Sequence, residues 1–262
     1  MIETNMKIDF PMTREHYVSS WKIFRAISDE NVITAKHIIG LNSWNKNISR
    51  ILDLGCGDGL ITRELVLRSE QSFETIKLVD PDTLMINEAV DSIKNTNKVK
   101  NIERINSPFE EAFNIVSIDV DIILAIHLVY LIEKESFYNL INNLPNNVTL
   151  IIVLDSEDSI FTKLWKRTAR KYHDRSLFVR DYIDNLDKKD FVINKTFINS
   201  NFVNPYERTD IEKESLLSLL SYSNYNKFNE DDKKFVSTLV KENLINNYLN
   251  CKSVCYEVTK VD

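Results

Sequence analysis

The sequence predicts an α/β fold built on a doubly wound, mostly parallel, seven-stranded sheet. Two observations lead to this prediction. Apolar runs of strand length alternate with helical patterns through the first 155 residues, which is the rhythm of βαβ units. Two of these runs, residues 120–126 and 148–154, are apolar as expected for strands of a parallel sheet that helices cover on both faces.

The expected elements follow one another in a definite order. Two helices, at 15–27 and 31–41, form an N-terminal helical segment. The sheet then follows, with strands at 50–54, 75–79, 101–105, 120–126 and 148–154 and helices at 60–68 and 84–93. After residue 155 come helical stretches at 159–172, 176–186, 213–221 and 231–247, and a last strand at 252–259. We expect a single domain over 1–262, with a helical lid at 1–48, a core at 49–155, and a helical cap with the last strands at 156–262.

Three of the chain's four glycines, Gly55, Gly57 and Gly59, lie within five residues of one another, between the first strand and the next helix. Glycine has no Cβ, so the backbone N–H groups of such a loop can approach a ligand closely. The N-terminus of the following helix adds further donors. This loop therefore predicts a site for a nucleotide-type cofactor.

The spacing of the glycines separates the cofactor classes. A dinucleotide fingerprint needs its third glycine where this chain has Leu60. The G-x-G-x-G pattern preceded by Asp53 resembles motif I of the class I S-adenosylmethionine-dependent methyltransferases, which have a Rossmann-like fold. A second motif agrees, because Asp80 follows the strand at 75–79, where its carboxylate can accept hydrogen bonds from both ribose hydroxyls. Two ordinary βα turns with an incidental aspartate are the alternative.

The composition disfavours several other classes of protein. The net charge is −6, and the basic stretch at 166–175 is typical of a solvated helix face, so nucleic-acid substrates are not expected. Cys56, Cys251 and Cys255 show neither metal-ligand spacing nor a disulfide framework, which indicates no metal and a reducing, cytoplasmic location. The longest apolar run, 122–132, is too short to span a bilayer. We expect a cytoplasmic enzyme for a small molecule, with a monomer favoured.

Within the class I methyltransferases, the chain resembles the histamine N-methyltransferase family from end to end, although distantly. The stretches that carry the resemblance are HYVSSWKIFRAISDEN, ILDLGCGDGLIT with LVDPD, DIILAIHLVYLI, IFTKLWKRTARKY and, more weakly, NNYLNCKSVCYEV. The first and fourth lie outside the generic cofactor motifs. The resemblance implies a Rossmann-like sheet with an N-terminal helical lid and a helical substrate cap, and S-adenosyl-L-methionine as the cofactor.

The resemblance also implies which residues hold the cofactor. They are the glycine loop with the acidic residue before it, the ends of the second and fourth strands, the loop after the third strand and a lid residue. In this sequence these positions are Tyr17, Asp53, Gly55, Cys56, Gly57, Gly59, Asp80, Pro81, Met85, Ser107, Pro108, Phe109 and Ile126.

For the methyl acceptor, the resemblance implies Glu30, His127 and Asn250 as polar contacts and Tyr130 and Trp165 as aromatic packing. Glu30 would orient a cationic or N–H-bearing group, and His127 would accept a proton or hold the substrate. These two are the candidate catalytic residues. Other readings stay open, because Glu30 also suits a helix N-terminus, Trp165 a hydrophobic core, and Asn250 a turn before a strand.

Two departures from the family bear on the acceptor. His127 replaces a glutamine, which introduces a group that titrates near neutral pH, and Leu131 stands where the family often has a tyrosine. Histamine is therefore not the expected substrate. The sequence predicts methyl transfer to a small-molecule amine or imidazole-type nitrogen. The alternatives are a small-molecule O-methyltransferase with a carboxylate or hydroxyl acceptor, and a catalytically silent cofactor-binding module.

Overall fold

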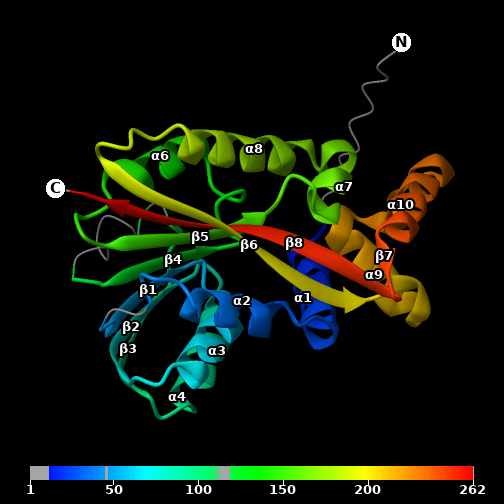
Figure 1. Ribbon diagram of the computed structural model, residues 1–262. Coiled ribbons are helices and arrows are strands. Elements are labelled where there is room, and N and C mark those ends of the chain that lie inside the picture. Colours follow the sequence, from blue (N-terminus) through cyan, green and yellow to red (C-terminus); the bar gives the residue numbers. More distant parts are fainter. Residues whose placement is uncertain (1–11, 45–46, 110, 112–118, 262) are drawn as a thin grey trace. The chain divides into compact units, whose positions relative to one another are not determined.

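The computed structural model describes residues 12–44, 47–109, 111 and 119–261 (Figure 1). The chain begins with α1 (Arg14–Ile27) and α2 (Glu30–Ile39). An alternating region follows, made of β1 (Arg50–Leu54), α3 (Leu60–Arg68), β2 (Phe73–Val79), α4 (Thr83–Lys94), β3 (Val99–Ile105), β4 (Ile122–Ile126), α6 (Lys134–Asn142) and β5 (Thr149–Asp155). The remaining elements are α7 (Ile160–Thr168), α8 (Arg170–Asp184), β6 (Phe191–Val203), η1 (Pro205–Glu207), α9 (Asp210–Ser221), η2 (Tyr225–Lys227), α10 (Glu230–Glu242), β7 (Leu244–Ile245) and β8 (Tyr248–Lys260).

The strands form one mixed sheet in the order β3-β2-β1-β4-β5-β8-β6, and the short β7 pairs with β8. β1 pairs in parallel with β2 and β4, β2 with β3, and β4 with β5. The pairing of β7 with β8 is antiparallel, and the arrows of β6 and β8 point in opposite directions in Figure 1. The predicted α/β fold with a mostly parallel, seven-stranded path is thus confirmed.

The described residues divide into two compact units. Unit 1 comprises Met1–Glu30, Asp155–Leu177 and Asn199–Ser253, and unit 2 comprises Asn31–Leu154, Phe178–Ile198 and Val254–Asp262, in both cases without the residues outside the description. Both β6 and β8 contribute residues to each unit. The expected single domain with lid, core and cap segments stays a prediction.

Unit 2 contains the parallel strands, with helices on both faces (Figure 1). One layer of its core joins the strands to buried aliphatic residues of α2, α3 and α4, among them Ile38, Leu65 and Ile86. On the other face, Phe137 of α6 is buried and packs edge-on against Tyr182 of α8, with 5.8 Å between ring centroids. The central strands are apolar on both sides for this reason, since each alternate side chain meets a helix.

Unit 1 is held together by aromatic packing. Phe24 of α1 lies 5.2 Å from Phe202 of β6 and 6.1 Å from Phe161 of α7, measured between ring centroids. The ring centroid of Tyr17 of α1 similarly lies 5.6 Å from that of Tyr222, the residue directly after α9. Large aromatic side chains contribute most of the buried area in such a cluster.

The expected helix at 159–172 is two helices in the structure. α7 ends at Thr168, where the backbone leaves the helical region at Ala169. The Thr168 carbonyl accepts a hydrogen bond from Ser223 Oγ at 2.9 Å, and its hydroxyl donates to the Ser221 carbonyl at 2.7 Å. These contacts from the end of α9 replace the bonds of a continuous helix. α8 includes most of the range predicted as a helix at 176–186, but it begins at Arg170 and ends at Asp184.

The expected helix at 231–247 is also too long. α10 ends at Glu242, and Asn246 and Asn247 both have positive φ, of 49° and 69°. They form the two-residue turn of a hairpin in which Ile245 pairs with Tyr248. The last strand therefore starts at Tyr248, earlier than the predicted 252, and neither β6 nor α6 was expected from the sequence.

Candidate cofactor site

The glycine loop joins β1 to α3 in a conformation that favours glycine. Gly55, Gly57 and Gly59 have φ values of +68°, +54° and +71°, in the left-handed region. Gly59 is the N-cap of α3, which begins at Leu60. At the carboxyl end of β1 the chain therefore passes from a strand through a left-handed loop to a helix N-terminus. This arrangement allows a nucleotide-type cofactor to approach the backbone closely.

Two neighbouring segments, α4 and the residues after β4, border this loop in unit 2. A Cβ on Gly59 would lie 2.7 Å from Ala89 Cβ of α4, so only glycine fits there. A Cβ on Gly55 would approach Leu128, in the segment after β4, to 2.8 Å. At Gly57 the nearest atom would be Met85 Cε at 3.8 Å. The loop is thus bounded by α4 and by the residues after β4, and only at its middle glycine would a Cβ make no more than an ordinary van der Waals contact.

Asp80, at the end of β2, is tied to the same loop. One carboxylate oxygen accepts a hydrogen bond from the Gly57 N–H at 2.9 Å, and the other accepts one from the Asp82 N–H at 2.8 Å. A carboxylate can accept about four hydrogen bonds, which is the capacity that binding both ribose hydroxyls would draw on. Asp82 in turn caps α4 by accepting from Leu84 and Met85. The side chain predicted to bind ribose is therefore held in place by two backbone donors.

Asn106 is a residue of this region that sequence reasoning missed. It follows β3, and its side-chain amide donates to the Asp80 carbonyl at 2.9 Å while its amide oxygen accepts from Thr83 Oγ1 at 2.7 Å. It thereby links the loop after β3 to the loop after β2. An asparagine next to the predicted Ser107 was the available signal, but asparagine after a strand is also an ordinary turn residue.

Asp53 and Cys56, two further residues predicted to hold the cofactor, lie in β1 and in the glycine loop. Asp53 is buried in β1 and accepts a hydrogen bond from Thr62 Oγ1, which anchors the first turn of α3 to the strand. Burial first, and then the charges of Asp53 and Asp80, raise the pKa of the Cys56 thiol far above its ordinary value. The thiolate form of Cys56 is thus disfavoured, and whether Asp53 and Cys56 contact the cofactor stays a prediction.

The remaining cofactor residues predicted in unit 2 lie on the segments around the glycine loop. Pro81 is exposed directly after Asp80, and Met85 is buried on α4. In the loop after β3, Ser107 Oγ donates to the Pro108 carbonyl at 3.1 Å, and Phe109 is buried. Ile126 is the last residue of β4. Whether each of them contacts a cofactor stays a prediction.

Comparison with solved structures identifies the fold. A Bacillus halodurans protein provisionally assigned as a methyltransferase is 12% identical, with a TM-score of 0.57, over 88% of this chain and 99% of that one. The YcgJ protein from Bacillus subtilis is 15% identical, with a TM-score of 0.55, over 87% and 99%. The methyltransferase domain of the bacterial protein CtHen1 is 15% identical, with a TM-score of 0.51, over 87% and 98%. The fold is that of the class I methyltransferases.

Likenesses at these identities establish the fold and say nothing of the methyl acceptor. No protein-family model matches the chain, and no curated protein matches its sequence. The similarity to the histamine N-methyltransferase family therefore stays a prediction. Within the class I methyltransferase fold, the glycine loop and Asp80 occupy the carboxyl ends of β1 and β2, the edge at which parallel sheets bind their ligands.

His127 follows β4 at the same edge of the methyltransferase sheet. Its φ is +53°, uncommon for a residue other than glycine, and its backbone N–H donates to the Val153 carbonyl of β5 at 2.8 Å. Its half-buried ring lies 6.3 Å from that of Tyr130, between centroids. Because the next residue, Leu128, borders Gly55, the structure brings His127 and Tyr130 to the side of the glycine loop.

The other four predicted residues, Tyr17, Glu30, Trp165 and Asn250, belong to unit 1. Glu30 is buried as the first residue of α2, and its N–H donates to Ser28 Oγ at 3.1 Å. The Asn250 amide donates to the Ser200 carbonyl and to Asn201 Oδ1 at 3.4 and 3.3 Å. The cofactor and acceptor roles expected of these four residues stay predictions.

Trp165 and Tyr17 both contact a third aromatic residue, Tyr222, which the sequence analysis did not single out. Trp165 is 2% exposed and lies 5.8 Å from Tyr222, which also contacts Tyr17. Tyr172 approaches the same ring to 4.3 Å, again between centroids. Tyr222 has a positive φ of 48°, a conformation that a bulky side chain rarely adopts and that no sequence signal announces.

Two further sequence expectations concern metals and membranes. Among the residues that the structure describes, no group of His, Cys, Asp and Glu side chains could hold a metal ion. In the same residues, no helix combines the length and the apolar character that crossing a membrane demands.

Proposed function

We propose that this chain is an S-adenosylmethionine-dependent methyltransferase. The observation that carries the proposal is the pairing of the Asp80 carboxylate with the Gly57 N–H at 2.9 Å, in a left-handed glycine loop at the carboxyl edge of a parallel sheet. The class I methyltransferase fold supports it. The residues present fit this cofactor, because a loop of left-handed glycines allows close approach to its backbone beside a carboxylate that is held in place.

Each part of the cofactor would have its own residues. The backbone of Gly55–Gly59 would hold the amino-acid portion, and Asp80 would accept from the ribose hydroxyls. Pro81 and Met85, with the Asn106–Ser107 loop, would border the adenine ring. When bound, the cofactor supplies a methyl group on a sulfonium, which is already activated for transfer.

The chain's part in transfer would then be positioning and proton control. An amine attacks only through a neutral, lone-pair-bearing nitrogen, so a proton has to leave the acceptor. His127, at the end of β4 beside the glycine loop, is our candidate to accept that proton directly or through water. The hydrogen bond from its backbone N–H to the Val153 carbonyl holds His127 in the left-handed conformation, which fixes the position of its Cβ.

We favour a small-molecule amine or imidazole-type nitrogen as the acceptor. Support comes from the electrostatics of unit 1, where Glu30 and Asp155 are both buried. Burial first, and then the charges of Glu30, Asp155 and Asp29, raise the pKa of the Cys251 thiol well above its ordinary value. Buried carboxylates such as Glu30 and Asp155 would favour a cationic acceptor over a carboxylate. In our proposal Glu30 orients the acceptor's charged or N–H-bearing group.

A transfer assay with labelled methyl donor tests this function. The purified protein is incubated with methyl-labelled S-adenosylmethionine and a panel of amines, imidazoles, carboxylic acids and alcohols. We expect label in an N-methyl product that survives mild base. A base-labile product would show a methyl ester and would contradict the nitrogen acceptor. No transfer to any member of the panel, despite cofactor binding, would favour the silent binding module.

Two variants separate catalysis from cofactor binding. His127→Ala is expected to lower turnover by at least about tenfold, the usual minimum for a proton-transfer residue, while the affinity for S-adenosylhomocysteine is unchanged. Glu30→Gln is expected to raise KM for the acceptor and to leave cofactor affinity unchanged. An unaltered rate in His127→Ala would remove His127 from the mechanism.

A further inference from the structure

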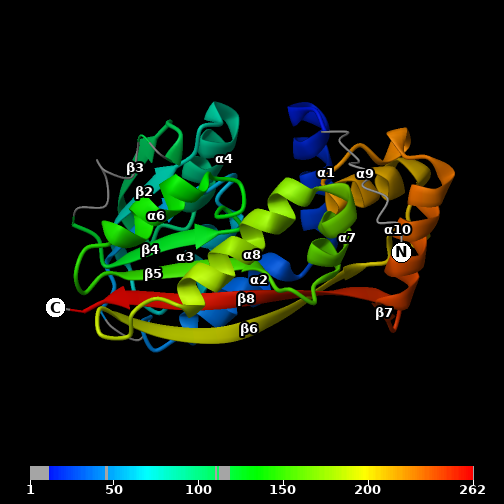
Figure 2. The ribbon, with the colours of Figure 1, turned by 90° about the horizontal axis from the view of Figure 1, so that it is seen from above.

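The backbone of Asp80 is held by the end of β3, in addition to the contacts that hold its carboxylate. Its N–H donates to the Ile105 carbonyl at 3.3 Å, and its carbonyl accepts from the Asn106 side-chain amide at 2.9 Å. β2 and β3 lie side by side at one edge of the sheet in Figures 1 and 2, and both belong to unit 2. Both peptide groups of Asp80 are therefore fixed by the neighbouring strand.

The Asn106 side chain takes the place of a missing backbone hydrogen bond. Val79 is the last residue of β2 and pairs with Ile105, the last residue of β3. If this parallel ladder continued, the next bond would run from the Ser107 N–H to the Asp80 carbonyl. The Ser107 N–H instead turns back to the Ile105 carbonyl, at 3.1 Å. The amide of Asn106 thus supplies the donor that the ladder no longer provides to Asp80.

The other end of the Asn106 amide is bonded to α4. Its oxygen accepts from Thr83 Oγ1 at 2.7 Å, and Thr83 is the first residue of that helix. The turn from Asp80 to Thr83 also contains Asp82, whose N–H donates to the Asp80 carboxylate at 2.8 Å. Asn106 therefore binds both ends of the turn that carries this carboxylate.

These two contacts require an asparagine. The side chain has an NH₂ group that donates and an oxygen that accepts, and both are used. An aspartate could still accept from Thr83, but it has no hydrogen for the Asp80 carbonyl and would place a second negative charge beside Asp80. An alanine would provide neither contact. The residue type at position 106 is thus matched to its two partners.

We propose that Asn106 is a positioning residue for cofactor binding and that it acts through Asp80. The inference rests on the proposed function, since the carboxylate that it orients is the one expected to bind the ribose hydroxyls. Asn106 holds the turn before α4 in the conformation in which the Asp80 carboxylate accepts from the Gly57 N–H. A carboxylate that is already in place binds the ribose at a smaller cost in conformational entropy.

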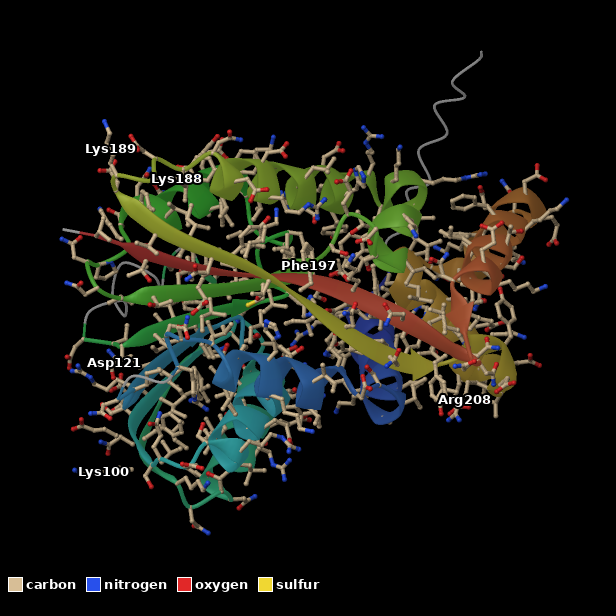
Figure 3. All side chains as sticks on the ribbon, in the orientation of Figure 1. Lys100, Asp121, Lys188, Lys189, Phe197 and Arg208 are labelled. Carbon is tan, nitrogen blue, oxygen red and sulfur yellow. The ribbon has the colours of Figure 1, made fainter. Side chains whose placement is uncertain are left out.

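Calorimetric titration with S-adenosylhomocysteine tests this role. Asn106→Ala is expected to weaken binding about three- to tenfold, as the loss of about one net hydrogen bond implies. Asn106→Asp should weaken binding at least as much. The matched control is Asn101→Ala, which alters an exposed asparagine of the same strand and should bind like the wild type. Asn101 directly follows Lys100, which is labelled in Figure 3, and lies at the other end of β3 from Asn106.

A double-mutant cycle separates positioning from a direct contact with the cofactor. If Asn106 acts through the Asp80 carboxylate, Asn106→Ala should change the affinity by less than about twofold in the Asp80→Ala background. A merely additive loss, equal to that in the wild-type background, would give Asn106 an effect independent of Asp80. That result would overturn the proposal.

Variants of Thr83 test the same device without altering Asn106. Thr83→Val removes the hydroxyl that holds the Asn106 oxygen and should weaken binding about two- to fivefold, whereas Thr83→Ser keeps a hydroxyl and should bind like the wild type. Wild-type binding that neither Asn106→Ala nor Thr83→Val weakens would overturn this inference alone. Absence of binding by the wild type would overturn the proposed function and this inference with it.

Discussion

Gly59 combines three constraints in one residue: it closes the glycine loop, caps α3 and touches α4. Its φ of +71° is strained for any side chain, and a Cβ would lie 2.9 Å from the Ala89 Cα, a backbone atom that cannot move aside cheaply. We predict that Gly59→Ala lowers the free energy of unfolding by about 1–3 kcal/mol. Urea denaturation of the purified variant measures this change.

The chain provides a matched control in Gly40, after the end of α2. Its φ is not positive, and the atom nearest to an added Cβ is the His37 carbonyl oxygen at 3.4 Å. Gly40→Ala should therefore change the unfolding free energy by less than about 1 kcal/mol. Equal losses in the two variants would mean that the packing of Gly59 against α4 is not what makes glycine necessary there.

His37 gives the fold a pH dependence. Its Nε2 lies 2.8 Å from Thr196 Oγ1, and burial lowers its pKa below the ordinary value of 6.5, against the opposing effect of Glu257. The unfolded chain then binds the proton more readily than the folded one. His37 therefore contributes its full stability above pH 6.5, and this contribution is lost as the pH falls below that value.

We predict that His37→Gln flattens this dependence, because glutamine can still bond to Thr196 but does not titrate. Urea midpoints at about pH 7.5 and about pH 5.5, on either side of the ordinary histidine value, should differ less in the variant than in the wild type. The same difference in both proteins would assign the pH dependence to other groups.

At the scale of elements, Asp121 fastens the start of β1 to the start of β4. Its carboxylate accepts from the N–H groups of Ser49 and Arg50, both at 2.8 Å, and from the Arg50 guanidinium at 3.1 Å. Burial alone would raise the pKa of Asp121, but these donors outweigh it and lower the pKa below 3.8. This contribution to stability is thus complete above pH 3.8 and is lost as the pH falls further.

We predict that Asp121→Asn lowers the free energy of unfolding at neutral pH by about 1–3 kcal/mol, since two backbone donors lose a charged acceptor. The difference from wild type should shrink in acid. Asp119→Asn is the control, because Asp119 pairs with the same arginine but its side chain is largely exposed, and such pairs contribute little. A larger loss in the control than in Asp121→Asn would contradict this assignment.

Elements were predictable where local pattern and burial agree. The bounds of β1 and α3 match the predicted 50–54 and 60–68, because an apolar strand and a glycine loop mark them unambiguously. β6 was missed, since its alternating Asn, Lys and Thr residues resemble a loop and only β8, about 50 residues later, makes it a strand. The break after α7 depends on Ser223, which is equally remote in sequence.

The candidate site divides in the same way. Asp80 and the glycines could be predicted from their spacing, because the residues of a cofactor motif lie close together in the sequence. Asn106 and Tyr222 could not be found from the sequence, since their significance comes from contacts with residues of distant segments. The hairpin at Asn246 and Asn247 was different: two adjacent asparagines are a recognised turn signal and could have ended the predicted helix early.

At the scale of the whole molecule, our main proposal is that the glycine loop and Asp80 bind S-adenosylmethionine. These residues lie at the carboxyl edge of a class I methyltransferase fold, with Asp80 beside a left-handed glycine loop. The proposals for the acceptor and for the proton path through His127 can each fail without affecting this claim. The claim itself depends only on residues of unit 2.

Isothermal titration with S-adenosylmethionine and S-adenosylhomocysteine tests it most directly. We predict saturable binding of both to the wild type and at least about tenfold weaker binding to Asp80→Ala, a loss of about 1.4 kcal/mol or more. Asp121→Asn, altered at the other end of the strands, serves as the folded control and should bind like the wild type. Absence of binding by the wild type, or unchanged affinity in Asp80→Ala, would contradict the account.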